Sequence, residues 1–427
     1  MKDIIIAPNK SIGRNTKTLL CLFCFFSFLL AFVYDEMFTS RIGVISLITL
    51  NIYMIWYSFK GRDVGLLFFY LFALLYSIVP LGYLFGGFQI AFLDYCQNPK
   101  IVNLVLRDLL LFHAILAYFV KPLKADRIVI PSYRNDFFFI VCLLFFIVCY
   151  TQGLTGNNIF EAGGYGGDIA KSKSTLFEYG IIPLSLMLIF SFDNKRLYLS
   201  YIAAFLFIFK SLIYGGRIEV IELTICILLV KLQNIWSIKK ISLVIIVGAI
   251  FMATWGAYRT LDKGMSLVFS DENASEVYFS SMRIHYLIDK GILSFADRTE
   301  ALIWYFIGTV IPQSMQPPLG NLQQYLKDVY PSGGGGLAMT YFYAYGGYLA
   351  VALLSLFVVK VFNKRSSKKP AMRIYSMFVV AMIPRWYAYY PVHLIKFCLI
   401  GTIIFIISIK YLNSRRIKNI PHYASNY

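Results

Sequence analysis

The sequence predicts an all-α integral membrane protein, and three observations support this fold class. Of the 427 residues, 59% are hydrophobic and only 15% are charged, whereas about a quarter of a soluble domain is charged. Apolar stretches of roughly 17–25 residues, long enough to cross a bilayer, recur along the chain. Short loops that carry Lys and Arg alternate between them. We therefore expect one polytopic membrane domain over residues 1–427, with about twelve spans.

Length and flanking charge place these spans in order along the chain. The first six lie near Thr18–Tyr34, Ile42–Phe59, Val64–Phe85, Ile101–Phe119, Phe137–Tyr150 and Leu176–Phe192. The other six lie near Leu197–Tyr214, Ile218–Trp236, Ile241–Tyr258, Leu337–Val359, Ile374–Tyr390 and His393–Leu412. The fifth is short, with Tyr133 as an alternative start. The first lacks a small-residue cleavage site and is interpreted as a retained span.

The connecting loops divide into a basic set and an opposite set. The basic set comprises residues 10–17, 60–62, 121–127, 195–196, 239–240, 364–369 and 415–418. Because cytoplasmic loops are enriched in Lys and Arg, both termini are predicted to be cytoplasmic. The same bias explains much of the net charge of +18, so no nucleic-acid partner is expected.

Two loops on the outward side are long. Residues 151–175 are rich in Gly and Asn, and residues 259–336 form the longest polar stretch of the chain. Within the latter, Asp297 and Glu300 have the spacing of a capping box and precede the apolar run Ala301–Ile311. That run is too short to span, so we expect a helix that lies in the membrane interface or dips partway into the membrane, ended by Pro312, Pro317 and Pro318. Glu276–Lys290 is expected to form a second short helix.

Outward arginines run against the positive-inside bias and therefore need another reason. Arg217 follows Tyr214-Gly-Gly at the outer mouth of a span, Arg259 ends the next outward-going span, and Arg385 follows Pro384 in a late span. An arginine at such depth is costly unless it is paired or binds an anion. One interpretation of all three is a fork that holds a diphosphate. The alternative for Arg217 is a salt bridge with Glu219 or a snorkelling anchor, that for Arg259 is an interfacial anchor, and that for Arg385 is an ion pair with Glu219 or Glu222.

Further candidates lie in the outward stretch and just after it. His285 is a natural acid or base near neutral pH, and solvation is its alternative fate. Arg283 and Arg298 are its basic neighbours in sequence. Tyr341, Tyr343 and Tyr345 follow the Gly run, where they would either stack on sugar rings or belong to the core. No metal or phosphate-loop motif occurs, so no metal or cofactor is expected.

These features together resemble the O-antigen polymerases, the Wzy-type oligosaccharide repeat unit polymerases. The local matches are Tyr214-Gly-Gly-Arg217, the run from Gly333 to Tyr348, and Arg385, which resembles an arginine in a late span of that family. Many members carry an acidic residue shortly after the Gly run, where this chain has Thr340-Tyr341-Phe342-Tyr343.

The resemblance implies a metal-independent glycosyltransferase of the bacterial inner membrane with a GT-C-like helical fold. Its donor and acceptor would be glycans linked to undecaprenyl diphosphate, and a chain-length regulator would be a further partner. The departing diphosphate would be stabilised by Arg217, Arg259 and Arg385, supported by Arg283 or Arg298. The attacking hydroxyl would give its proton to His285 or Glu300, while Tyr214 and Tyr341 would contact substrate.

Two other functions remain open from the sequence. An O-antigen ligase moves glycan onto the lipid A core on a similar scaffold. A flippase or other transporter would show inverted repeats, broken helices in matching positions and charge along a central path. No repeat is found in the sequence. Arg107 and Asp108 lie inside the fourth span, but as neighbours they are expected to point in different directions.

Overall fold

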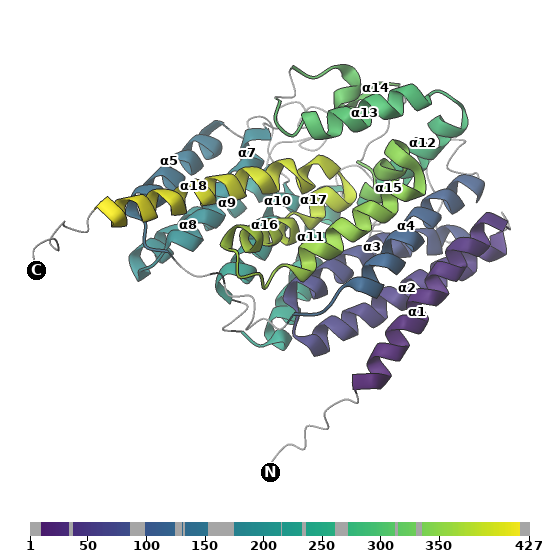
Figure 1. Ribbon diagram of the computed structural model, residues 1–427, viewed down its shortest axis with the longest axis horizontal. Coiled ribbons are helices and arrows are strands. Elements are labelled where there is room, and N and C mark those ends of the chain that lie inside the picture. Colours follow the sequence, from purple (N-terminus) through teal and green to yellow (C-terminus); the bar gives the residue numbers. More distant parts are fainter. Residues whose placement is uncertain are drawn as a thin grey trace, which may run out of the picture. The chain divides into compact units, whose positions relative to one another are not determined.

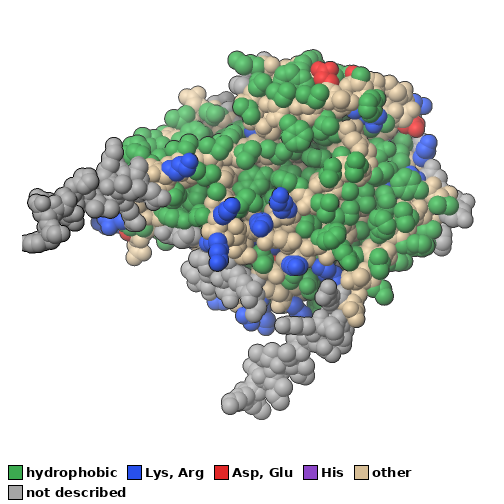
Figure 2. All heavy atoms as spheres, viewed as in Figure 1, with side chains coloured by type: hydrophobic (Ala, Val, Ile, Leu, Met, Phe, Trp, Pro, Cys, Tyr) green, Lys and Arg blue, Asp and Glu red, His purple; other side chains and the backbone are tan. Residues whose placement is uncertain are grey.

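The computed structural model describes residues 10–33, 37–85, 99–123, 130, 133–152, 175–214, 216–232, 236–260, 272–311, 315–329 and 335–418. Within these ranges the chain is helical and contains no β-strand, which confirms the predicted all-α class. In the described part of the chain, seven helices are long and apolar enough to cross a membrane: Asn15–Val33, Thr39–Gly61, Val64–Leu81, Lys100–Phe119, Asn194–Ile213, Ala338–Asn363 and Pro391–Tyr411. Hydrophobic side chains cover much of the face in Figure 2, as expected of helices in lipid.

The chain forms two compact units. Unit 1 comprises Met1–Lys124, Ser270–Asn363 and Ile383–His393. Unit 2 comprises Ala125–Phe269, Lys364–Met382 and Leu394–Tyr427.

Unit 1 is built around α4 (Pro99–Phe119), one of its most completely buried long helices (Figure 1). The helices that pack against it are α1 (Lys10–Val33), α2 (Met37–Gly61), α12 (Glu272–Asp289) and α15 (Ala338–Asn363). The turn before α3 (Val64–Phe85) is fixed by Asp63, whose carboxylate accepts the backbone N–H of Leu66 at 2.9 Å and of Leu123 at 2.7 Å. Burial on several faces leaves α4 little access to lipid, so polar side chains on it face protein.

The described part of the long polar stretch contains α12, α13 (Phe295–Ile307) and α14 (Leu322–Val329), near the N-terminal end of α15 (Figure 1). These elements share a hydrophobic core comprising Ile284, Leu287, Leu293, Ala301, Leu322, Leu326, Tyr341 and Ala344. The hydroxyl of Tyr278 donates to the carbonyl of Val102 at 3.1 Å and ties α12 to α4. The second short helix predicted at Glu276–Lys290 is thus confirmed as the larger part of α12.

The predicted capping box at Asp297 and Glu300 is wrong by three residues. Ser294 is the cap, because its backbone is extended and its hydroxyl accepts the N–H of Asp297 at 3.2 Å. The Asp297 carboxylate returns a bond to the N–H of Ser294 at 2.9 Å, which completes the box. Glu300 is therefore an exposed residue inside the helix, which ends at Ile307, before Pro312 is reached.

The tenth predicted span is broken inside the membrane-length helix α15. Gly346 and Gly347 leave helical geometry, and Gly347 has φ +63°, a conformation that favours glycine. The residues before the break, Ala338–Tyr345, form a short helical segment of their own. That segment carries the tyrosines that follow the Gly run.

Unit 2 contains α5 (Asp136–Gln152), α7 (Thr175–Tyr179), α8 (Ile181–Phe190), α9 (Asn194–Ile213), α10 (Arg217–Ile227), α11 (Ile238–Thr260), α16 (Pro370–Ala381) and α18 (Lys396–Lys418). Every residue of α8 is buried. The sixth predicted span is interrupted at Gly180, and the eighth ends in a π-helical turn, Leu228–Leu232.

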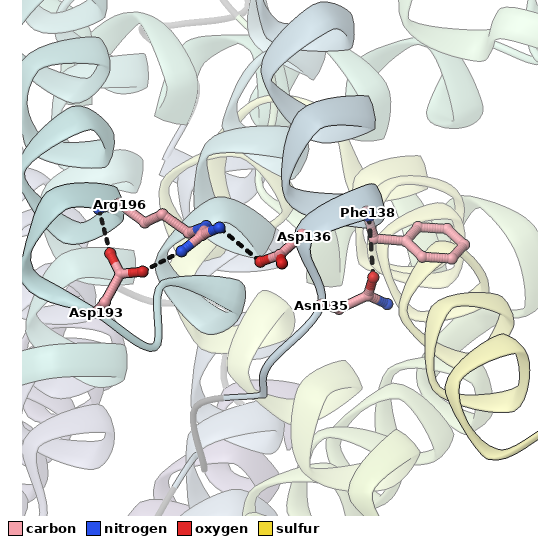
Figure 3. Close-up of polar contacts among 5 residues, drawn as sticks. All are labelled: Asn135, Asp136, Phe138, Asp193 and Arg196. Atoms are coloured by element: carbon pink, nitrogen blue, oxygen red, sulfur yellow. Dashed lines mark hydrogen bonds and ion pairs between the residues drawn. The ribbon is translucent and has the colours of Figure 1, made fainter. Parts of the chain in front are cut away.

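The starts of α5 and α9 are joined by an ion-pair network of Asp136, Asp193 and Arg196 (Figure 3). Arg196 pairs with Asp136 at 2.6 Å and also with Asp193. Asp193 caps α9 by accepting the N–H of Arg196 at 2.8 Å, and Asn135 accepts the N–H of Phe138 at 3.1 Å. This end of unit 2 therefore has its helix termini satisfied by side chains.

Candidate functional site

The polar centre of unit 1 is a contact between His285 of α12 and Asp108 of α4. The Nε2 atom of His285 lies 2.8 Å from Oδ2 of Asp108, and the side chains are 1% and 0% exposed. A carboxylate only accepts hydrogen bonds, so beside the Asp108 carboxylate it is Nε2 of His285 that carries the hydrogen. This leaves Nδ1 of His285 as the basic nitrogen.

Aromatic rings surround this pair. The ring of Tyr343 lies 4.6 Å from the His285 ring between centroids, and Tyr348 lies 4.8 Å from Tyr343. Tyr348 in turn packs edge-on against Phe28 and Phe32 of α1, at 5.3 and 5.1 Å. Tyr343 and Tyr348 flank the break in α15, so that the break lies beside the His285–Asp108 pair.

Arginines border the same tyrosines. The guanidinium of Arg107 lies 4.7 Å from the ring centre of Phe32 and is an electrostatic neighbour of Tyr348. Arg107 and Asp108 do contact different partners, as expected of adjacent helical residues, yet both act on Tyr343 and Tyr348. The fourth span therefore contributes two charged groups to one site.

Arg283 and Arg298 add positive charge from α12 and α13. Arg283 is 0% exposed and is an electrostatic neighbour of Tyr341. Arg298 is half-buried, its guanidinium lies 5.6 Å from the ring centre of Phe295, and it acts electrostatically on Tyr343. Among the described residues, its buried Nε has no hydrogen-bond partner. We call the set Arg107, Asp108, Arg283, His285, Arg298, Tyr341, Tyr343 and Tyr348 the cationic cluster, since three arginines accompany one carboxylate.

The end of the Gly run holds α15 in place for this cluster. A side chain at Gly335 would collide with the backbone of Tyr389, and one at Gly336 would press on the ring of Tyr341. The N–H of Leu337 donates to the hydroxyl of Ser281 on α12 at 2.8 Å. Gly333 and Gly334 lie outside the described residues. A glycine is thus needed at least at position 335, where the backbones of Gly335 and Tyr389 approach closely.

Four predicted site residues belong to the cationic cluster: His285 and Arg298 are both neighbours of Tyr343, and Arg283 is a neighbour of Tyr341. The solvated alternative for His285 is wrong, because the ring is buried against Asp108. Tyr341 is 1% exposed and belongs to the core, so burial favours the core alternative over sugar stacking, whereas Tyr343 is half-buried. Glu300 is exposed on α13, and no contact of the described residues joins it to the cluster.

Other predicted residues lie elsewhere. Arg217 is the first residue of α10 in unit 2 and is half-buried. Glu219, its partner in one alternative from the sequence, lies in the first turn of the same helix and is buried. Tyr214 ends α9, where its N–H donates to the carbonyl of Lys210 at 3.1 Å.

The remaining candidates are only partly described. Arg385 lies in α17 (Ile383–Ala388) of unit 1, half-buried, and its carbonyl accepts the N–H groups of Tyr389 and Tyr390 at 2.9 and 2.7 Å. Arg259 lies in α11, and its side chain is outside what the structure describes, as are residues 153–174 of the Gly-rich loop.

Asp108 is the functional candidate that sequence reasoning missed. The available signal was its position inside an apolar span, where an ionisable residue is a site by default. Its partner is 177 positions away, which no local spacing could indicate. Within the described ranges, no three His, Cys, Asp or Glu side chains gather as a metal site would require.

The fold and the cluster define a class: a helical membrane protein with a buried, arginine-rich polar site between its membrane-length helices and the shorter helices α12 and α13. The sequence matches no protein-family model, no curated protein and no solved structure.

Proposed function

We propose that this protein is a glycosyltransferase that polymerises undecaprenyl-diphosphate-linked oligosaccharide repeat units into O-antigen or a related surface polysaccharide. The observation that carries the proposal is the cationic cluster, in which the His285–Asp108 pair lies beside Tyr343 and three arginines act electrostatically on the tyrosines of α15. Transfer from a lipid diphosphate needs a base for the attacking hydroxyl and cations for the leaving group. The cluster offers both kinds of group.

His285 is the proposed general base. With Nε2–H donated to Asp108, Nδ1 is oriented to accept a proton from the acceptor hydroxyl. Asp108 acts as a positioning residue, because it fixes the ring and stabilises the imidazolium that forms. Tyr343, stacked on the ring at 4.6 Å, limits its rotation. Glu300 is left out of this role since it is exposed on α13.

The arginines of the cluster are the proposed diphosphate site. Guanidinium groups match phosphate oxygens in two-pronged hydrogen bonds and keep their charge at any physiological pH. Arg298 is the strongest candidate for direct contact, since its buried Nε lacks a protein partner among the described residues. Arg385 supports the same role from α17, while Arg217 and Arg259 keep the diphosphate role that the resemblance implies for them.

In the proposed step, the oxygen of a hydroxyl on the fresh repeat unit attacks the anomeric carbon of the growing chain, and the hydroxyl proton passes to Nδ1 of His285. The bond between that carbon and the diphosphate oxygen breaks, and undecaprenyl diphosphate leaves as an anion that the arginines stabilise. The cationic cluster would then face the extracytoplasmic leaflet, with both termini in the cytoplasm and about twelve spans in a GT-C-like arrangement.

Gene deletion tests the proposal against its alternatives. Loss of a polymerase leaves single repeat units on the lipid A core, loss of a ligase leaves lipid-linked polymer, and loss of a flippase leaves neither at the surface. We expect the first pattern, and we expect His285→Ala and Arg217→Ala to reproduce it at normal protein level. Surface polymer of wild-type length in the deletion strain, or either of the other patterns, would refute the polymerase assignment.

A further inference from the structure

Helix α13 has a buried side and an unusually apolar exposed side. Ala301 and Tyr305 are 2% and 4% exposed and face the core shared with α15. The ring of Tyr305 also packs against the rings of Phe342 and Tyr345 of α15. On the opposite side, Phe295 is 76%, Ile303 52% and Phe306 54% exposed. At the helical angle of 100° per residue, these three fall within an arc of about 80°.

The exposed apolar face continues past the end of the helix. Val310 is 85% exposed and Met315 74%, both in the turn that follows. Comparable exposure occurs on the membrane-length helix α15, where Leu349 is 72% and Leu353 57% exposed. Figure 2, in the view of Figure 1, shows hydrophobic side chains covering the surface at this end of α13. The face thus has the composition of a surface that meets lipid.

The two threonine hydroxyls beside this face are satisfied within the protein. The hydroxyl of Thr299 donates to the carbonyl of Phe295 at 2.9 Å, and that of Thr309 donates to the carbonyl of Phe306 at 2.6 Å. Threonines that bond back to their own helix expose mainly their methyl groups. In hydrocarbon such internal pairing is required, because no water replaces it.

Both ends of α13 follow the same rule. The N-terminus has the Ser294–Asp297 capping box, which satisfies backbone N–H groups reciprocally. At the C-terminus, Nε2 of Gln316 donates to the carbonyls of Gly308 and Ile311, at 3.3 and 2.9 Å. Both ends of the helix thus have polar backbone groups paired within the protein, as a helix in hydrocarbon requires. These bonds favour hydrocarbon over a protein partner as the occupant, since a protein interface supplies polar partners of its own.

We propose that α13 lies in the hydrocarbon of one membrane leaflet, with the face formed by Phe295, Ile303 and Phe306 turned to lipid acyl chains. Its 13 residues extend about 20 Å at 1.5 Å per residue, less than a hydrocarbon core of about 30 Å, so it lies in the leaflet without spanning it. Arg298, on the same helix, is thereby held between the lipid and the cationic cluster. The inference does not depend on the proposed function.

Nitroxide labels at single introduced cysteines test this placement. The protein is reconstituted in nanodiscs of phosphatidylethanolamine and phosphatidylglycerol, and Phe306→Cys, Ile303→Cys and the matched control Glu300→Cys are compared. The six described native cysteines are buried, and the unsubstituted protein measures the remaining background. Power-saturation EPR then gives the collision rate of each label with apolar oxygen and with a water-soluble nickel chelate.

We expect the ratio of oxygen to nickel collisions to be several-fold higher at Phe306 and Ile303 than at Glu300. Equal ratios at the three positions would place the face in water and overturn the proposal. Low collision rates with both reagents at Phe306 and Ile303 would show that protein covers the face, which would overturn it as well. Elution of each labelled protein as a single species, like the parent, verifies that the fold is kept.

Discussion

His285 and Asp108 are 177 positions apart in the chain, yet Nε2 of the histidine lies 2.8 Å from Oδ2 of the aspartate. Both side chains are almost fully shielded from solvent. The contact joins α12, from the long polar stretch of the sequence, to α4, at the centre of unit 1. This part of the polar stretch is therefore buried in the interior of unit 1.

His285→Ala should lower the rate of polymerisation by about 10²–10⁴-fold, the usual contribution of a general base. The measurement is repeat-unit addition by purified protein to a lipid-linked acceptor, at equal amounts of folded protein. His393→Ala is the matched control, because His393 is a half-buried histidine of the same unit that lies outside the cationic cluster. An unchanged rate in His285→Ala would remove histidine from the mechanism.

Asp108→Asn should change the tautomer of His285, because an amide no longer requires the hydrogen to be on Nε2. The chain has four histidines, so the spectrum of ¹⁵N-histidine-labelled protein is simple enough to assign with single variants. We expect the Nε2–H tautomer at His285 in the parent and a mixture in Asp108→Asn. Asp108→Glu should retain part of the parent signal. An identical tautomer in parent and Asp108→Asn would contradict the positioning role.

Arg283→Ala should lower the rate by about 10²–10³-fold, as loss of one electrostatic donor does in other enzymes. Arg283→Lys keeps the charge but loses the planar fork, so it should recover only part of the rate. Lys290→Ala, a cation at the exposed end of the same stretch, serves as the control and should act like the parent. Equal rates in Arg283→Ala and Lys290→Ala would exclude Arg283 from the site.

Gly335→Ala should destabilise the fold by about 1–3 kcal/mol, the usual cost of overpacking, because a Cβ there meets the Tyr389 backbone. The same substitution at Gly248 is the control. That glycine lies within α11 with no atom in reach of a Cβ, so alanine should be neutral or stabilising by up to about 1 kcal/mol. Thermal unfolding midpoints in detergent compare the two. A midpoint for Gly335→Ala at or above that of the parent would contradict the close approach.

Acidification should weaken the ion-pair network of Asp136, Asp193 and Arg196 in unit 2. The pKa of the Asp193 carboxyl is lowered, first because it accepts the backbone N–H of Arg196 and further because it pairs with the Arg196 guanidinium. A carboxyl with a lowered pKa contributes stability above its unfolded value, about 3.9, and loses it as the pH falls through the folded pKa.

Asp193→Asn provides the comparison, since asparagine also caps helices but does not titrate. The unfolding midpoint should fall less between about pH 7 and about pH 3 in Asp193→Asn than in the parent. Equal falls in the two proteins would show that Asp193 does not contribute to the acid sensitivity.

Much of the helical framework could be predicted from the sequence, because apolar length and flanking charge report directly on helices in lipid. The breaks were harder to predict. Gly346 and Gly347 were visible as residues, but whether a glycine pair bends a long helix depends on what packs beside it. The capping error at Asp297 has a similar origin, since Ser294 competes for the same helix start and backbone geometry decides between them.

The site was predictable in part. His285, Arg283 and Arg298 stood out because they lie in a polar stretch where little else has chemistry. Asp108 did not, since its meaning depends on a partner that is remote in the sequence. From its position after the Gly run, Tyr341 was predicted to contact substrate, but its ring packs in the hydrophobic core.

The all-round burial of α12 has a consequence for engineering. Residues 280–285, which together point to every side of that helix, are at most 1% exposed. Residues 272–329 are therefore no detachable insert, and a graft of this stretch from another protein would have to bring the facing surfaces of α4 and α15 along with it. Chimaeras meant to alter what the protein acts on should accordingly exchange these surfaces as one block.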